Sequence, residues 1–367
     1  MTSRNPDPAA RLDRAKRRAR IFRSPPRRPL AVRRAVQVLT LLVTVAIGLQ
    51  FAHWVGGVMD GARVGVRPPG VEGFLPISAL ISLRHWVADG TFSMIHPAGL
   101  VIFGLACLTA LFLKKAFCSW LCPVGTVAEA LARLSHLAFR RRIKLPTWLD
   151  RSLRGLKYLL AFYFVYAVFV QMSPHEIAAF LNSPYNKVAD IKMLLFFTQM
   201  SALTAKVLGA LVILSFVVPY FWCRFLCPYG ALLGLLSSLS PLKIERRLPD
   251  CTACGHCAAV CPAFLDVDRK TRVADPECTG CLECVAQCPA PEALAVRAGR
   301  GWRGRLRPVV FAAAVLLIFF GGIGLAKLSG RWRTEIGEAE FMRRAQELDS
   351  PKYHHARGRV PEYGPGD

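Results

Sequence analysis

Two groups of closely spaced cysteines occur in the second half of the chain. The segments CTACGHCAAVCP at 251–262 and CTGCLECVAQCP at 278–289 share the pattern C-x2-C-x2-C-x3-C-P. In this pattern three thiolates bind one cubic iron–sulfur cluster, and the fourth, before the proline, binds the cluster of the other segment. Zinc also binds C-x2-C pairs, but two complete copies with the terminal Cys-Pro favour two 4Fe-4S clusters.

The same rule predicts which cysteines bind each cluster. The first ligand set is Cys251, Cys254, Cys257 and Cys288, and the second is Cys278, Cys281, Cys284 and Cys261. Small residues between the ligands, including Gly255 and Gly280, allow the backbone to curl around a cluster and point its amides at the sulfurs. These cysteines are the predicted metal and cofactor ligands.

A second motif occurs twice, as FCSWLCPVG at 117–125 and WCRFLCPYG at 222–230, 105 residues apart. It supplies four more cysteines, which are Cys118, Cys122, Cys223 and Cys227. Cysteines four residues apart share one face of a helix, and the proline that follows ends the regular turn. We therefore predict two similar broken helix ends that present four thiols to one another.

These four thiols are predicted redox or metal-binding residues, with two alternatives for their chemistry. They could bind a further iron centre, or each pair could cycle between dithiol and disulfide. A reducing compartment works against persistent disulfides and favours the metal. Simple packing of buried cysteines would not account for the repetition of the flanking aromatic, Leu, Pro and Gly residues.

The elements that must position these cysteines are membrane helices. The chain has 367 residues, of which 53% are hydrophobic, and a formal net charge of +24. A membrane helix needs about 20 consecutive apolar residues. The predicted spans, five in number, are 35–55, 96–113, 158–172, 207–222 and 308–326. Residues 193–205 are too short for a span, and we expect them to lie at the interface or to begin the fourth span early.

The basic residues predict the orientation of these helices. Cytoplasmic loops of membrane proteins are rich in Lys and Arg, and segments 1–34, 114–157 and 224–307 hold 34 of the 48 Lys and Arg residues. We expect these segments to be cytoplasmic, in a bacterial inner membrane, with the C-terminal tail outside. The cysteine motifs then lie where thiols stay reduced. The positive charge is assigned to membrane lipid headgroups, and no nucleic-acid partner is expected.

The predicted fold is mainly α, a polytopic membrane bundle of about five spans with a small cytoplasmic insertion like a two-cluster bacterial ferredoxin. The predicted domains are a basic N-terminal segment (1–34), a four-span membrane domain (35–240), the ferredoxin-like domain (241–300), a fifth transmembrane helix (308–327) and an exposed C-terminal tail (328–367). The tail is too short for a core of its own. The spans have no charged residues in their interiors, which argues against an ion or proton transporter.

Four histidines, His53, His85, His96 and His175, fall near the predicted outer face. Histidines there could ligate haem or transfer quinol protons. Interface histidines are usually satisfied by water and headgroups, and we expect the same of these four.

The paired C-x3-C-P motifs at helix ends, followed by a two-cluster ferredoxin segment, resemble the NapH/NosR/YccM family of membrane-bound iron–sulfur proteins. The segments GFLPISALISLRHW and MIHPAGLVIF add to this resemblance, which covers residues 35–326. It implies electron transfer between a quinol pool or flavoprotein donor and a redox partner protein, with the chain as the redox subunit of a quinol dehydrogenase and quinone as a candidate ligand. Neither flavin nor haem is assigned, since the 34 residues before the first span are too few for a flavin domain.

A second resemblance gives the alternative function. Oxidase-assembly proteins of the RdxA and CcoG type also combine membrane spans with this ferredoxin segment. By that resemblance the chain would be a maturation protein that reduces a metal or thiol in a partner. Those proteins typically carry a sizeable C-terminal β-domain, whereas 41 residues follow the last predicted span here. Whether quinol alone reduces the clusters separates the two functions.

Overall fold

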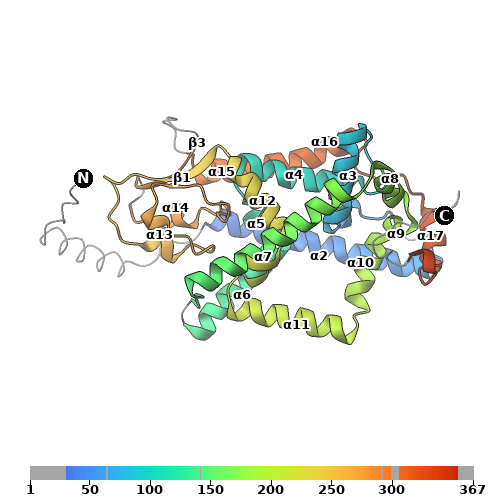
Figure 1. The fold of residues 1–367 in the computed structure, drawn as a ribbon, viewed down its shortest axis with the longest axis horizontal. Coiled ribbons are helices and arrows are strands. Elements are labelled where there is room, and N and C mark those ends of the chain that lie inside the picture. Colours follow the sequence, from blue (N-terminus) through green and yellow to red (C-terminus); the bar gives the residue numbers. More distant parts are fainter. Residues whose placement is uncertain (1–29, 63–64, 141, 291, 299–305, 354–367) are drawn as a thin grey trace, which may run out of the picture.

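The computed structural model describes residues 30–62, 65–140, 142–290, 292–298 and 306–353. These residues form an elongated, mainly helical bundle with a small sheet-containing unit at one end (Figure 1). The predicted basic segment 1–34 lies outside the described residues except for residues 30–34, and so does the part of the tail beyond Tyr353.

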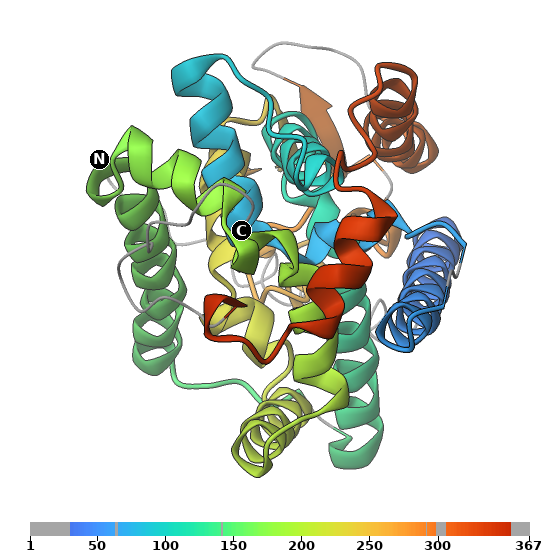
Figure 2. The same cartoon turned by 90° about the vertical axis from the view of Figure 1, so that its right-hand side faces the viewer.

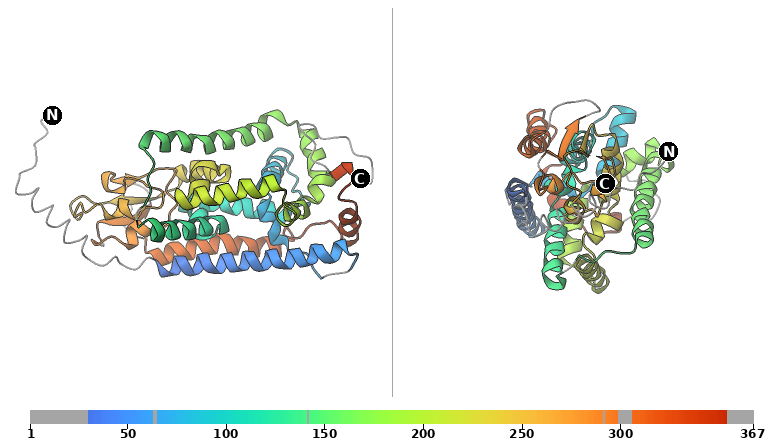
Figure 3. Two further views of the ribbon diagram at one scale, coloured as in Figure 1. Left: turned by 90° about the horizontal axis from the view of Figure 1, so that it is seen from below. Right: turned by 90° about the vertical axis from the view of Figure 1, so that its left-hand side faces the viewer.

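Long helices run lengthwise through the bundle (Figure 3). They are α2 (Ala31–Met59), α4 (Pro97–Leu113), α7 (Thr147–Tyr166) with the π-helical turn η2 (Ala167–Gln171), α11 (Ala202–Val217), and α15 (Pro308–Leu316) with the π-helical turn η5 (Leu317–Gly321) and α16 (Gly322–Leu328). Viewed along the long axis, α2, α7, α11 and α16 lie at the periphery (Figure 2). Apolar side chains on them face outward, for example Leu39 and Leu49, which are 62% and 68% exposed. A lipid environment is the natural solvent for such a surface.

Among the described residues, three helical segments are long and apolar enough to cross a membrane. They are Ala31–Met59, Thr147–Gln171 and Pro308–Leu328, and a fourth crossing is present if α10 (Ala189–Thr198) and α11, bent by 80°, count as one span. Residues 193–205 thus straddle this bend. The predicted second span coincides with α4, which is apolar but only 17 residues long. The structure supports three to four spans by length and composition, compared with five from sequence.

Helix α4 is the central helix of the bundle. It is apolar on all sides, and its buried residues lie along its whole length from Pro97 to Leu113. A helix without a polar face is buried by its neighbours or by lipid. Here α3 (Pro76–Asp89), α12 (Pro228–Leu239) and the 3-10 helix η1 (Pro69–Phe74) pack against it.

Short helices gather at the end opposite the sheet. They include α8 (Pro174–Asn182) and α9 (Pro184–Lys187), which lead into α10. Helix α8 begins with a capping box. The Glu176 amide donates a hydrogen bond to the Ser173 hydroxyl, and the Ser173 amide donates one to the Glu176 carboxylate. This cap fixes the sharp turn between the end of α7 and α8.

The C-terminal segment packs at the same end, so the prediction of an exposed tail is wrong for its described part beyond Ile336. Helix α17 (Glu338–Gln346) and the 3-10 helix η6 (Pro351–Tyr353) bury Phe341 and Tyr353, which are 2% and 1% exposed. Phe341 meets Trp54 of α2 edge to face, with ring centroids 5.5 Å apart. The segment needs no core of its own, because its apolar face completes the core at the end of α2.

The sheet-containing unit at the other end carries the ferredoxin motifs. Its strands are β1 (Leu242–Arg246), β2 (Arg272–Val273) and β3 (Leu294–Ala298), which form an antiparallel sheet in the order β2-β1-β3. The short helices α13 (His256–Ala259), η4 (Val267–Arg269) and α14 (Glu283–Ala286) complete it. Ile244 of the central strand pairs with Val273 and Val296, and all three side chains are buried beneath the cysteine loops.

Candidate functional site

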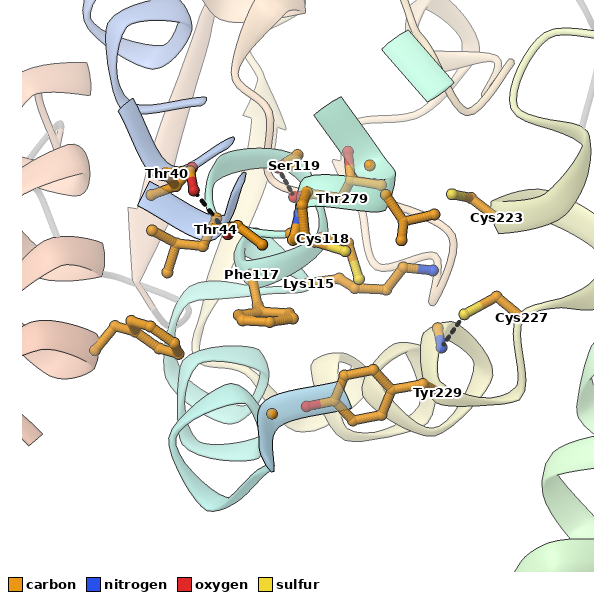
Figure 4. A pocket seen from close by; sticks show the side chains of 18 of the residues that line it. Thr40, Thr44, Lys115, Phe117, Cys118, Ser119, Cys223, Cys227, Tyr229 and Thr279 are labelled. Carbon is orange, nitrogen blue, oxygen red and sulfur yellow. Dashed lines mark hydrogen bonds between the residues drawn. The ribbon is translucent and has the colours of Figure 1, made fainter. Parts of the chain in front are cut away.

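The four cysteines of the C-x3-C-P motifs line one cavity of about 500 Å³. Cys118 lies on α5 (Ala116–Trp120) and Cys223 on the π-helical turn η3 (Trp222–Leu226). Cys122 and Cys227 cap the N-termini of α6 (Pro123–Phe139) and α12. Cys223 lies near the other three thiols, and Figure 4 shows Cys118, Cys223 and Cys227 around the same space. We refer to these four cysteines as the thiol site.

Both motifs end in the same backbone hydrogen bond, although the first lies on an α-helix and the second on a π-helical turn. The amide of the second cysteine donates to the carbonyl oxygen five residues earlier, from Cys122 to Phe117 and from Cys227 to Trp222, both at 2.9 Å. The proline that follows starts the next helix, where a missing N–H has no cost. In the first motif a Cβ on Gly125 would clash with the carbonyl oxygen of Cys118, so this position requires glycine. The repeated sequence therefore encodes a repeated turn.

The helix that follows each motif packs against the long helix that leads into the other motif. Helix α4 leads into the first motif and α11 into the second. Helix α6, which follows the first motif, packs against α11, and α12, which follows the second, packs against α4. Each motif is held between its own long helix and that of the other motif, so the four thiols are positioned by packed helices rather than by a free loop.

The cavity extends from the thiol site along apolar side chains of the long helices. Ile47 of α2, Ile102 of α4 and Ile323 of α16 line it. At the thiol site Phe117 and Tyr229 meet edge to face, with ring centroids 6.0 Å apart, and both stand beside the cysteines in Figure 4. A mostly apolar cavity with polar groups gathered in one region is typical of a site for an amphipathic small molecule.

A buried charge cluster forms part of the cavity wall. Arg33 of α2 donates to both carboxylate oxygens of Glu129 on α6 and to one oxygen of Glu283 on α14, all at 2.8 Å. Gln37 also donates to Glu129, at 2.9 Å. Arg33 and Glu129 line the cavity, and Glu283 neighbours Cys284, a predicted cluster ligand. This cluster therefore links the first long helix, the thiol site and the ferredoxin unit.

A second charge cluster is centred on Glu277, which precedes Cys278. Its carboxylate accepts from Lys157 at 2.6 Å and from the Tyr158 hydroxyl at 2.7 Å. Lys115, which precedes the first C-x3-C-P motif, lies 3.9 Å from the same carboxylate. Lys115 and Glu277 line the cavity beside the thiol site.

The ferredoxin cysteines lie in two neighbourhoods. Cys257 lies near Cys254 and Cys288. A small separate cavity is lined by four of the predicted ligands, which are Cys261, Cys278, Cys281 and Cys284. Cys261 thus lies among the cysteines of the second segment, and Cys288 lies near Cys257 of the first. Cys251 is contacted by the guanidinium of Arg246, with an Nη1 to Sγ distance of 3.5 Å.

The backbone of both loops fits an anionic cluster. Residues two and four positions after the first cysteine have positive φ in each loop, at Ala253 and Gly255 and again at Gly280 and Leu282. Left-handed residues in such turns direct successive amides into one concavity, which binds anions. Burial raises the pKa of Cys281 to about 12, so its free thiol is protonated at neutral pH and iron binding must displace that proton.

The thiols in the described part of the chain are not grouped as the ligands of one metal ion would be. Among the residues that the structure describes, no three His, Cys, Asp or Glu side chains are grouped to hold one metal ion. Zinc would need Zn–S distances of about 2.3 Å, which brings four sulfurs within about 3.8 Å of one another. In a cubic iron–sulfur cluster each thiolate binds a different iron, so its ligands stand further apart.

Sequence reasoning missed the charged residues of the site and misjudged one histidine. In the sequence, nothing distinguishes Arg33, Glu129 and Glu277 from ordinary charged residues in loops and at helix ends. They become part of the cavity only through partners far along the chain. His96 was expected to be hydrated at the outer face. It is instead buried, with its Nε2 2.6 Å from the carbonyl oxygen of Asn186 and its Nδ1 3.7 Å from Glu72.

Comparison with known proteins finds two matching family models. One, described as a 4Fe-4S binding domain, matches residues 95–146 and 204–247, which hold the two C-x3-C-P motifs. The other, described as a 4Fe-4S dicluster domain, matches residues 243–289. No solved structure matches the chain.

Relatives of this chain occur among bacterial ferredoxin-type proteins. YccM of Escherichia coli (strain K12), which is named for electron transport, is 39% identical over 317 residues, 85% of this chain and 88% of YccM. The ferredoxin-type protein MauN of Methylorubrum extorquens, named for methylamine utilization, is 27% identical over 63% of this chain and 74% of its own length. The ferredoxin-type protein NapH of Escherichia coli is 28% identical over 45% of this chain and 55% of its own length.

Proposed function

The chain belongs to the family of ferredoxin-type electron transport proteins that includes YccM and NapH, and we propose that it relays electrons between quinol in the membrane and a soluble redox partner. Quinol gives up two electrons and two protons as it becomes quinone. Two 4Fe-4S clusters accept one electron each, so together they match one quinol. The two protons pass to water.

The observation that carries this proposal is the cavity that joins the thiol site to apolar helix faces. Its volume of about 500 Å³ lies within the usual range of about 300–1,000 Å³ for small-molecule sites. A quinol ring would lie beside Cys118, Cys227 and Tyr229, with its apolar tail along α2 and α16. Charged groups at that end, Lys115 and Glu277, offer polar contacts to the ring hydroxyls.

We propose that the thiol site is the first electron acceptor. Four thiolates in one cavity could bind an iron centre of more than one iron, or the pairs could cycle as dithiols. The metal remains the favoured alternative on the cytoplasmic side of a membrane. The two ligand sets of the ferredoxin unit are proposed as the motif predicts them, supported by the neighbourhoods of Cys257 with Cys288 and of Cys261 with Cys278.

We also propose five membrane crossings, with the ferredoxin unit cytoplasmic and α17 outside. Support comes from the alternating direction of α2, α4, α7, α11 and α15–α16, which puts the ferredoxin unit and α17 at opposite ends (Figure 3). Among the described residues, more Lys and Arg lie in the segments at the ferredoxin end than in those at the other end. Helix α4 is short, but it would cross inside a ring of other helices, where its length need not match the bilayer.

Reporter fusions test this topology. Fusions after Asp60 and after Lys327 are expected to report the outer side, and a fusion after Leu248 the cytoplasm, because basic segments stay inside. Fluorescent and alkaline-phosphatase reporters at the same positions serve as mutual controls. An outer location for the Leu248 fusion would invert the whole assignment and remove the argument that the thiols stay reduced.

Quinol titration tests the function. Anaerobically purified protein is expected to contain acid-labile sulfide and to show the broad visible band of 4Fe-4S clusters, which quinol alone then bleaches. An oxidase-maturation protein of the alternative class would need another reductant. Stoichiometric zinc without sulfide, or clusters that dithionite reduces but quinol does not, would contradict the proposal.

A further inference from the structure

We propose that electrons pass between the thiol site and the ferredoxin unit only through the set Cys261, Cys278, Cys281 and Cys284, and that the set Cys251, Cys254, Cys257 and Cys288 faces the soluble partner. We call these the proximal and distal sets. The inference rests on the proposed function and adds the order of the two clusters, together with the residue that positions them.

The cavity wall reaches the proximal set directly. Cys281 and Thr279 line the same cavity as the thiol site, whereas the described lining residues include no member of the distal set. Arg33, which also borders the cavity, donates at 2.8 Å to Glu283, the neighbour of Cys284 in the proximal set. An electron that leaves the thiol site therefore meets the proximal set first.

Two hydrogen bonds join the thiol motif to the loop of the proximal set. The Ser119 hydroxyl donates to the carbonyl oxygen of Thr279 at 2.7 Å, and the Trp120 indole N–H donates to that of Gly280 at 3.1 Å. Ser119 follows Cys118 in sequence, and Thr279 and Gly280 lie between Cys278 and Cys281. A short run of covalent and hydrogen bonds thus connects the two cysteine motifs. Trp120 is completely buried, so its geometry is fixed by packing.

Glycine at position 280 allows the loop of the proximal set to lie close to α4 and α15. Its φ is +62°, and a Cβ there would lie 3.2 Å from the carbonyl oxygen of Leu113 and 3.4 Å from Phe311. The backbone of the proximal loop therefore rests directly on the ends of α4 and α15. The salt bridge from Arg33 to Glu283, beside Cys284, fixes the loop from its other side.

Burial separates the two sets in the same order. Three of the four cysteines of the proximal set are buried and Cys278 is partly exposed, whereas all four cysteines of the distal set are partly exposed. A cluster that passes electrons to a soluble partner must lie close to solvent, and one that receives them from the membrane need not. Each electron would then reduce the cluster of the proximal set and pass on to the cluster of the distal set. The second electron of the quinol would follow the same route.

Ligand variants test the order. In Cys254→Ser, which removes a distal ligand, quinol is expected to reduce the remaining proximal cluster as in wild type. In Cys284→Ser, quinol should fail to reduce the remaining distal cluster, although dithionite still does. The reverse pattern would overturn the inference. If quinol does not reduce the wild type, the proposed function fails, and a second readout still decides the order.

That readout uses dithionite-reduced protein and a water-soluble paramagnetic ion. The ion is expected to broaden the EPR signal left in Cys284→Ser more than the signal left in Cys254→Ser, because the distal set is closer to water. Equal broadening, or the opposite order, would contradict the assignment whatever the electron donor is.

Trp120→Phe tests the connection without changing any ligand. This variant keeps the aromatic ring but loses the N–H donor to Gly280, and removal of such outer hydrogen bonds costs about 10- to 100-fold in activity. We expect quinol-driven reduction of the proximal cluster to slow by that factor, while iron and sulfide contents stay at wild-type values. Trp148→Phe, at a position 68% exposed, is the matched control. Equal rates in the two variants would show that Trp120 only fills space and would remove this connection from the proposed route.

Discussion

Replacing both Cys122 and Cys227 with serine is expected to reduce quinol-driven reduction of the ferredoxin clusters to background. These cysteines belong to the thiol site, which lies between the apolar cavity and the proximal loop. They are not among the ferredoxin ligands, so the clusters should assemble normally and dithionite should still reduce them. Stopped-flow spectroscopy of the iron–sulfur band measures both rates in the same preparation.

Two comparisons make this result interpretable. Cys107→Ser changes a cysteine of α4 that lies outside the motifs, and it should leave the quinol-driven rate unchanged. The iron content of the double variant distinguishes the two alternatives for the thiol site. Less iron than in the wild type, with both ferredoxin clusters still present, would favour a metal centre. An unchanged iron content would favour the dithiol alternative. Unimpaired reduction by quinol in the double variant would show that these cysteines only pack.

Replacing Arg33 with methionine is expected to destabilise the contact between the membrane bundle and the ferredoxin unit by about 3–5 kcal/mol, the cost of leaving buried partner charges uncompensated. The Arg33 side chain is 3% exposed, and its partners Glu129 and Glu283 are 12% and 8% exposed. The clusters should therefore be lost at a lower temperature. Thermal loss of the visible cluster band in detergent measures the change.

Arg34→Met is the matched control, because Arg34 is the neighbouring arginine and is exposed. It should leave the melting profile unchanged, since exposed charges contribute little. Adding Glu283→Gln to Arg33→Met should recover part of the loss by removing one uncompensated carboxylate. If Arg33→Met and Arg34→Met melt at the same temperature, the buried cluster does not hold the two parts together.

The sequence predicted 4Fe-4S binding, which the two matching family models support, because ligand spacing is a local property; the ligand sets and the chemistry of the thiol site stay predictions. The C-x2-C loops and the duplicated C-x3-C-P turns depend on residues within a few positions of each other. The left-handed backbone at Leu282 was not predicted, since a bulky residue rarely adopts positive φ. It occupies the position that Gly255 has in the first loop, and only that comparison of the two loops could have suggested it.

Long-range features were beyond sequence reasoning for a physical reason. The Arg33–Glu283 pair joins residues 250 positions apart, and no periodicity or composition reports such a contact. Whether α6 packs against its own long helix or against α11 depends on the shapes of both surfaces, which the repeat does not reveal. The buried C-terminal segment was missed because its length was judged alone, without the exposed end of α2 that it covers.

Quinol-dependent electron transfer in liposomes tests the central claim most directly. Purified protein, reconstituted with quinol in the bilayer and no soluble mediator, should pass electrons to a water-soluble acceptor at its ferredoxin end. Protein stripped of iron and sulfide, and the Cys122→Ser/Cys227→Ser variant, should not. The account predicts that acceptor reduction requires both the clusters and the thiol site. Transfer at the wild-type rate by the stripped protein, or no transfer by the fully loaded wild type, would contradict it.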